Sequence, residues 1–163
     1  MLHGQKIAFV FIIDNDTKMV PGLKSRIWHH EKLVKQLLRD EVCIMGRKTH
    51  DLTKWKGDKS WVLTRDKNWR RVGIGTLGSL DDLHLHTEAE KVFVLGGKSL
   101  FKKLQHNVDE LRMYVINNRE GSETFPKIKM EEWKPMDYLS EKIWSYGHLE
   151  RREIEDNDDY LFE

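Results

Sequence analysis

The chain has 163 residues, of which 39% are hydrophobic and 34% charged, and its formal net charge at pH 7 is +1. We expect one domain over residues 1–163, because a chain of this length can bury roughly two thirds of the surface that it exposes when unfolded. The near-neutral charge gives no electrostatic reason to expect a nucleic-acid or membrane partner, and we expect a monomer with a small-molecule substrate. The single cysteine, Cys43, has no partner for an intramolecular disulfide, which favours a reducing, cytoplasmic setting.

The first predicted element is a strand over residues 7–13, because its unbroken apolar run is typical of a strand buried on both faces. The run is far shorter than the ~20 residues of a membrane-spanning helix. A polar loop over residues 15–26 then leads to a predicted helix over residues 28–38, whose apolar residues recur near the helical period.

Strands and helices alternate through the middle of the chain. The apolar runs predict strands over residues 42–45, 60–63, 72–76, 92–95 and 111–116. The segments between them predict helices over residues 48–55, 79–86 and 98–104, with Ser79 as the N-cap of the second helix. This alternation predicts right-handed crossovers between parallel strands.

The pattern changes after residue 126. Residues 144–153 and 160–163 flank an acidic turn, which predicts an antiparallel hairpin at the edge of the sheet. The predicted fold class is therefore α/β, with three layers: a mostly parallel central sheet, helices on both faces and an antiparallel C-terminal hairpin.

Two segments, residues 42–49 and 92–99, share one pattern. Each is an apolar strand that stops at glycine and continues at once with basic and hydroxyl residues. Such a turn points backbone N–H groups and a cation at one place, which suits a phosphate, and glycine permits close approach or a positive φ. Two such turns predict one extended ligand with several phosphates, bound between two strand ends.

Five segments together resemble the dihydrofolate reductase family. They are Ile-Met-Gly-Arg-Lys-Thr at residues 44–49, Val-Leu-Thr-Arg at 62–65, Val-Leu-Gly-Gly-Lys-Ser-Leu-Phe at 94–101, Gly-Ser-Glu-Thr-Phe-Pro at 121–126 and Tyr-Leu-Phe-Glu at 160–163. The resemblance implies a dihydrofolate reductase-like fold and an oxidoreductase of one-carbon metabolism. It would transfer hydride from NADPH to dihydrofolate and so give tetrahydrofolate.

The resemblance also implies binding residues for the cofactor and for the pterin substrate. Thr64 and Arg65 would bind the 2′-phosphate of the adenosine, which is the reason to expect NADP rather than NAD, since a guanidinium suits a phosphate dianion. The cofactor set is Val10, Gly46, Arg47, Lys48, Thr49, Leu63, Thr64, Arg65, Leu95, Gly96, Gly97, Lys98, Ser99 and Leu100. The substrate set is Ala8, Val34, Phe101 and Tyr114.

The catalytic position matches the family less closely. The family has a carboxylate early on the first helix, where it promotes protonation of the pterin. Ungapped counting from Asp14 to Met45 places His30 there, and Glu31 is the nearest carboxylate. A one-residue shift on a helix turns a side chain by about 100°, so only one of the two can occupy the position. We expect the catalytic group to be Glu31 or His30.

A second departure concerns the tail of folate. Asp58 stands where the family has an arginine for the glutamate carboxylate, and two carboxylates cannot pair at neutral pH. Two alternatives therefore stay open: a sibling reductase of the same fold that acts on another heterocycle, as in riboflavin synthesis, and a non-catalytic nucleotide-binding module. The histidine groups at residues 29–30 and 84–86 lack the spacing typical of zinc sites, and we expect no metal.

Overall fold

The computed structural model describes residues 1–14, 16, 18–19, 40–53, 59–116, 123–140 and 144–153. Ten strands and four short helices lie in these ranges. The strands are β1 (Lys6–Ile13), β2 (Lys18–Met19), β3 (Cys43–Gly46), β4 (Ser60–Leu63), β5 (Gly75–Leu77), β6 (Lys91–Leu95), β7 (Val108–Ile116), β8 (Glu123–Thr124), β9 (Trp133–Ser140) and β10 (Trp144–Arg151). The helices are α2 (Arg47–Thr53), α3 (Lys98–Leu104) and the 3-10 helices η4 (Leu80–Leu85) and η5 (Met130–Glu132).

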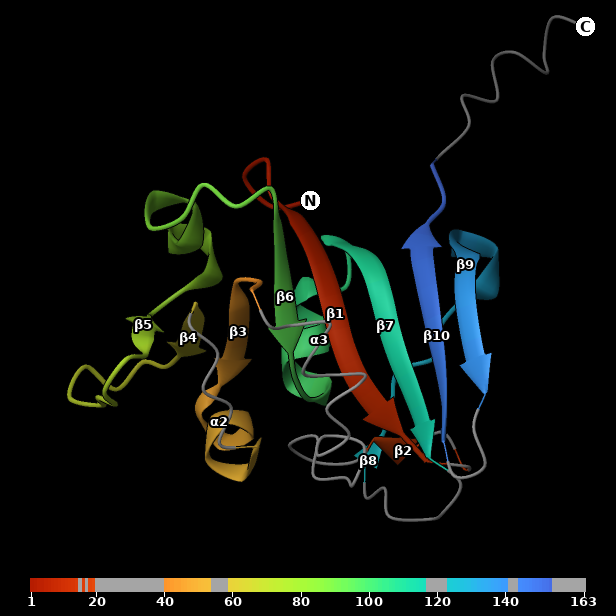
Figure 1. Cartoon of the computed structure of the whole chain (residues 1–163), viewed down its shortest axis with the longest axis horizontal. Helices are drawn as coiled ribbons and strands as arrows, with labels where there is room; N and C mark the ends of the chain where they lie inside the picture. The colour runs from red at the N-terminus through yellow and green to blue at the C-terminus, as the bar shows by residue number, and fades with distance from the viewer. Residues whose placement is uncertain are drawn as a thin grey trace, which may run out of the picture.

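The strands form one mixed sheet in the order β5-β4-β3-β6-β1-β7-β10-β9 (Figure 1). Every neighbouring pair from β5 to β7 is parallel, whereas β10 is antiparallel to both β7 and β9. The predicted α/β fold, mostly parallel with an antiparallel C-terminal edge, is confirmed. Among the described residues, no helix has the length and apolarity needed to cross a membrane.

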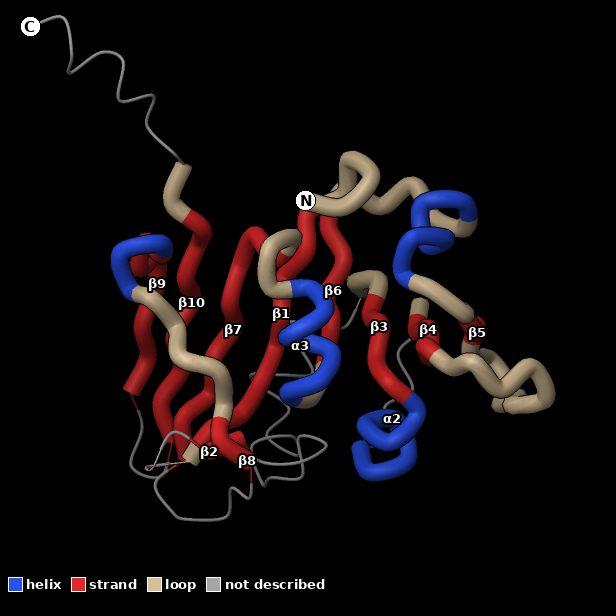
Figure 2. Tube along the Cα trace, turned by 180° about the vertical axis from the view of Figure 1, so that it is seen from behind, coloured by secondary structure: helices blue, strands red, loops and turns tan. Residues whose placement is uncertain are grey.

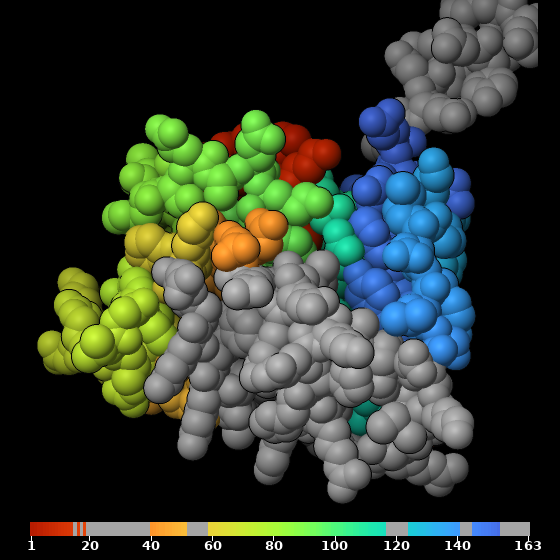
Figure 3. All heavy atoms as spheres, viewed as in Figure 1, coloured from red at the N-terminus to blue at the C-terminus, as the bar shows by residue number. Residues whose placement is uncertain are grey.

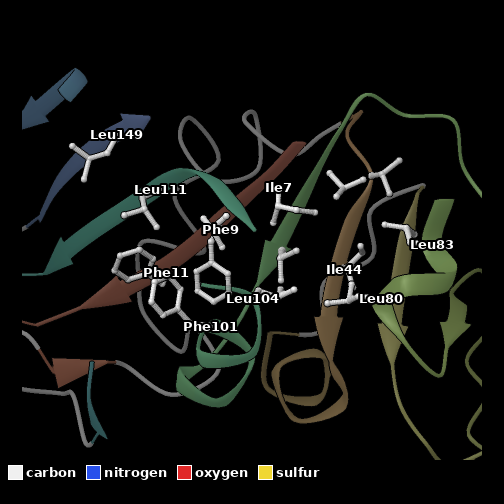
Figure 4. Close-up of a cluster of buried hydrophobic side chains, with 14 of the residues drawn as sticks. Ile7, Phe9, Phe11, Ile44, Leu80, Leu83, Phe101, Leu104, Leu111 and Leu149 are labelled. Atoms are coloured by element: carbon white, nitrogen blue, oxygen red, sulfur yellow. The ribbon is translucent and has the colours of Figure 1, made fainter. Parts of the chain in front are cut away.

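Strand β1 lies in the middle of the sheet and is buried on both faces, as its apolar run predicts. Alternate side chains of a strand point to opposite faces. Ala8, Val10 and Ile12 accordingly belong to one core cluster, whereas Phe9 and Phe11 belong to the other. Helix α3 covers the Phe9 face (Figure 2). Figure 4 shows Phe9 and Phe11 pointing toward Phe101 of this helix, and the Phe9 and Phe101 ring centroids are 5.0 Å apart.

The predicted C-terminal hairpin differs from the one observed. Strand β10 lies within the predicted range 144–153, but its antiparallel partner at the edge is β9. The predicted partner, residues 160–163, lies outside the described residues, as does the predicted helix over 28–38. Sequence reasoning missed β9 because seven of its eight residues are exposed and Pro135 interrupts it, so no alternation marks it as a strand.

Two elements in the middle of the chain also differ from prediction. The strand expected over residues 72–76 is instead β5, which begins at Gly75. Val72 is fully exposed and Gly73 has φ +77°, so this stretch forms a tight turn before the strand. The helix after Ser79 is 3-10 rather than α, although Ser79 caps it as predicted, by accepting a hydrogen bond from the backbone N–H of Asp81.

Candidate functional site

The two glycine turns come together at one edge of the sheet. Strands β3 and β6 are parallel neighbours, and Met45 pairs with Leu95. Gly46 is therefore the last residue of β3 and Gly96 directly follows β6, at the same end of the sheet, and the arrowheads of β1, β3, β6 and β7 all point toward that end (Figure 1). The predicted meeting of the two turns is confirmed. Open α/β sheets bind their ligands at such carboxyl ends.

Close packing, rather than a left-handed backbone, accounts for Gly96. Among the described residues, the glycines with positive φ are Gly4 and Gly73, so of the two properties that glycine permits, close approach and a positive φ, these turns do not use the second. A Cβ added at Gly96 would lie 3.1 Å from the Leu100 Cδ2 and 3.5 Å from the Phe9 Cζ. The backbone N–H of Gly96 donates to the Val10 carbonyl at 3.3 Å, which fixes the turn against β1.

A cavity of about 500 Å³ lies between the end of β4 and helix α3. Leu63, Thr64 and Arg65 line one side of it, and Leu100 lines it from α3. These four residues belong to the predicted cofactor set and come from two segments that are at least 35 positions apart in the sequence. The lining of the cavity includes leucine side chains and the guanidinium of Arg65, which suits a base attached to a phosphorylated sugar.

A second cavity, of about 610 Å³, adjoins the first. Both are lined by Thr64, Arg65 and Gly78, and the second continues along Lys67 and Arg70 of the loop after β4. This loop projects from one side of the molecule, in yellow-green in Figure 3. The concentration of basic side chains gives the second cavity a positive electrostatic potential, which attracts anions.

Hydrogen bonds within the loop fix its course. The Thr64 Oγ1 accepts from the backbone N–H of Asp66 at 3.1 Å, and the Asp66 Oδ1 accepts from the backbone N–H of Asn68 at 3.0 Å. Arg47, in the first turn of α2, donates to the Asp66 Oδ2 at 3.4 Å. This contact joins the loop to the first glycine turn, and it engages the guanidinium that the family resemblance assigns to the cofactor.

The remaining members of the predicted cofactor set differ in exposure. Val10 and Leu95 are fully buried in the core, and Thr49 is buried on α2. Exposed or half-buried side chains, which a ligand can reach from solvent, are those of Arg47, Lys48, Lys98 and Ser99.

The structure places the predicted substrate residues on opposite faces of the sheet. Ala8 and Tyr114 lie in the cluster on one face, whereas Phe101 packs against Phe9, Phe11 and Phe125 on the other. Burial raises the pKa of the Tyr114 hydroxyl well above its usual range. The other substrate and catalytic candidates, Val34, His30 and Glu31, lie outside the described residues, as does Asp58.

Several residues that line the two cavities were not singled out from the sequence as ligand contacts. Ser79 was identified only as a helix cap, and Lys103 and Gly78 carried no motif. The basic residues Lys67 and Arg70 follow Thr64-Arg65 closely, and this local excess of positive charge was the one available signal.

A cluster of charged side chains lies on β6, β7 and β10, apart from the two cavities. The Glu110 carboxylate is buried and lies 2.9 Å from the Lys91 Nζ, 3.1 Å from the His148 Nε2 and 3.7 Å from the Arg112 guanidinium. Burial alone would raise the pKa of Glu110, but the hydrogen bond from Lys91 and the charges of Arg112, Lys91 and His148 outweigh burial and lower it. Through these contacts with Glu110, the cluster connects side chains of β6, β7 and β10.

A mostly parallel sheet with two glycine turns and two cavities at the carboxyl ends of its strands defines an open α/β protein, the class that commonly binds ligands at this place. The family model of dihydrofolate reductase matches residues 9–143 of the chain. The chain belongs to the dihydrofolate reductase family.

Relatives and a solved structure agree with this assignment. The chain is 27% identical over 139 residues to the dihydrofolate reductase of Staphylococcus aureus (strain MSSA476), an alignment that covers 81% of this chain and 86% of that one. It is also 27% identical over 125 residues to that of Staphylococcus haemolyticus, covering 74% and 72%. Its fold is similar to dihydrofolate reductase from Enterococcus faecalis complexed with NADP(H) and RAB-propyl, with a TM-score of 0.73, 22% identity, and coverage of 93% and 99%.

Proposed function

We propose that this protein reduces dihydrofolate to tetrahydrofolate with NADPH. The observation that carries the proposal is the position of Thr64 and Arg65, which line both cavities at the carboxyl end of β4, close to the two glycine turns. Family membership supplies the reaction, and these residues supply the reason for NADPH in particular. The S. aureus relatives, which are named dihydrofolate reductase, support the same activity.

The donor set suits NADPH. The 2′-phosphate is the group that distinguishes NADPH from NADH, and the Arg65 guanidinium offers it a fork of charge-assisted hydrogen bonds. The Thr64 Oγ1 accepts from the Asp66 N–H, so its own hydroxyl hydrogen is directed by that bond and can be donated to a phosphate oxygen. Leu63 and Leu100 give the base two apolar contacts in the first cavity.

The two glycine turns would hold the pyrophosphate. Gly46 and Gly96 lie at adjacent strand ends, and the missing side chain of Gly46 lets the backbone approach a ligand closely there. A Cβ added at Gly46 would meet no atom within 4 Å, so its environment is open. Arg47 directly follows Gly46, Lys98 directly follows Gly97, and the two would supply positive charge on either side.

Bound NADPH would supply the hydride, and the protein would promote protonation of the pterin. We assign that second role to the pair His30 and Glu31. A carboxylate in an apolar pocket acts through a raised pKa, whereas a histidine already titrates near neutral pH. The substrate contacts of Ala8, Val34, Phe101 and Tyr114 remain part of this proposal.

The test is an assay of NADPH oxidation with dihydrofolate, compared with NADH as donor and with a riboflavin-pathway pyrimidine as acceptor. We expect oxidation with dihydrofolate and a clear preference for NADPH. Arg65→Ala should weaken NADPH binding by about 1.5–3 kcal/mol and leave NADH nearly unchanged. Turnover of the pyrimidine alone would identify a sibling reductase, as Asp58 favours. Binding without turnover would identify a nucleotide-binding module. Equal affinity for NADPH and NADH would contradict the NADP assignment.

A further inference from the structure

Two basic side chains of the loop after β4, Lys67 and Arg70, have no role in the proposed function. Both line the 610 Å³ cavity together with Arg65, and Asp66 is the one carboxylate among the described residues that line it. Asp66 also contacts Arg47 at 3.4 Å, so a cation outside the cavity offsets part of its charge. With three cations against one carboxylate, the cavity wall has a net positive charge.

The two cavities share a wall but differ in their charged side chains. In the first cavity Asp81 faces Arg65 and Lys103, and five leucines beside these polar groups offer a base apolar contacts: Leu2, Leu63, Leu80, Leu100 and Leu104. Basic side chains dominate the charged lining of the second cavity, which suits a phosphate. The shared wall is formed by Thr64, Arg65 and Gly78, so a nucleotide with its base in the first cavity would place its ribose there and its 2′-phosphate toward the second cavity.

The Arg70 guanidinium is held in place by its own loop. Its Nη1 donates to the carbonyls of Lys67 and Trp69, both at 2.8 Å. Among the described residues these are its hydrogen bonds, so its remaining N–H donors are available to an anion from a fixed position. A preorganised guanidinium loses little side-chain entropy when it binds phosphate. Lys67, on a flexible stem, supplies a second positive charge.

We propose that Lys67 and Arg70 are specificity-determining residues that bind the 2′-phosphate of NADPH from the side of the second cavity, opposite to the base. This inference rests on the proposed function, because it requires that NADPH is the cofactor. It adds two residues to the Thr64 and Arg65 pair that the family resemblance implies. It also assigns the two cavities separate tasks, with the base bound in the first and the discriminating phosphate in the second.

The experiment is calorimetric titration of the full chain with NADPH, NADH and adenosine 2′,5′-bisphosphate. The variants are Lys67→Ala, Arg70→Gln and the double variant; glutamine keeps an N–H donor for the loop carbonyls while it removes the charge. Lys102→Ala and Arg71→Gln are matched controls. Lys102 lines neither cavity, and the Arg71 guanidinium instead lies over the Trp69 ring, 5.2 Å from its centroid. Thermal unfolding without ligand verifies that each variant is folded.

We expect each variant to bind NADPH and the bisphosphate about two- to fivefold more weakly, and its affinity for NADH to change less than about twofold. The affinities of both control variants should be unchanged. The loss of NADPH affinity in the variants should become smaller as the salt concentration rises, because exposed charges are screened. Unchanged NADPH affinity in the double variant, or an equal loss for NADH, would overturn this inference. If Arg65→Ala still lowers NADPH affinity in that case, the proposed function stands. If the native chain binds neither nucleotide, the proposed function fails instead.

Discussion

The Arg47 guanidinium lies 3.4 Å from the Asp66 carboxylate, and this contact joins the first turn of α2 to the loop after β4. Both side chains are about half exposed, so the pair contributes at most about 1 kcal/mol to stability. Its larger effect is electrostatic. The carboxylate adjoins Arg65 in the sequence and places a negative charge beside the proposed phosphate site.

Asp66→Asn should therefore strengthen NADPH binding. The substitution removes a negative charge and releases Arg47, while the Asn oxygen can still accept from the Asn68 N–H and keep the turn. We expect a gain of about two- to fivefold for NADPH and little change for NADH, measured by calorimetric titration. Asp51→Asn, on the exposed side of α2, is the control and should have no effect. Weaker binding of NADPH by Asp66→Asn would show that the pair positions the loop.

Gly96→Ala tests the packing of the second glycine turn. The new Cβ would lie 3.1 Å from the Leu100 Cδ2, so Leu100 must move, and Leu100 lines the first cavity. We expect a loss of about 1–3 kcal/mol in the free energy of unfolding and weaker binding of both NADPH and NADH. Gly46→Ala is the control for stability, because its Cβ meets nothing within 4 Å. Urea unfolding of both variants with and without NADPH measures the two effects separately, and full stabilisation of Gly96→Ala by NADPH would mean that Leu100 does not contact the cofactor.

The elements that the sequence predicted best are those with a local signal. The strand at residues 60–63 and the helix at 98–104 are observed with the predicted bounds, because apolar periodicity and a glycine turn mark their ends. Strand β9 has no such signal, since it is an edge strand held by backbone pairing to β10 with most side chains in solvent.

The same distinction holds for the candidate site. Leu63, Thr64 and Arg65 belong to a family motif, and the structure places them at the cavities. Gly78 and Ser79 line the first cavity only because β5 pairs with β4 and brings the following turn beside Arg65. That pairing joins residues distant in sequence, and no local pattern encodes which loop residues it brings to the ligand.

Glu110→Gln should change both stability and its dependence on pH. Removing the charge leaves Lys91, Arg112 and His148 without their shared anion, at a cost of about 2 kcal/mol or more. This is below the roughly 3–5 kcal/mol of a fully buried pair, because the Lys91 side chain is 34% exposed. The pKa of Glu110 is lower in the folded protein, so its stabilising contribution is present above the unfolded value and is lost as pH falls through the folded value.

Urea unfolding at a series of pH values from 7 down to 3 checks this prediction. The native protein should lose stability on acidification more steeply than Glu110→Gln, and the two curves should converge at the acidic end. Glu90→Gln, an exposed residue next to Lys91, is the control and should follow the native curve. Parallel curves for the native protein and Glu110→Gln would mean that the carboxylate pKa is not lowered by folding.

The catalytic group can be assigned by comparing Glu31→Gln with His30→Ala in single-turnover hydride transfer from NADPH to dihydrofolate. If Glu31 is the acid, Glu31→Gln should lower the rate at neutral pH by roughly 10² or more, with NADPH affinity intact and His30→Ala mild. If His30 has the role, the sensitivities reverse, and the rate of the native protein should change with an inflection near the histidine pKa, ~6.5 before perturbation. The two outcomes differ in the pH dependence of the native rate as well as in which variant is impaired. A carboxylate needs a raised pKa to titrate near neutral pH, whereas a histidine does not. Full activity in both variants would exclude His30 and Glu31 as the group that promotes protonation and would mean that another residue has this role.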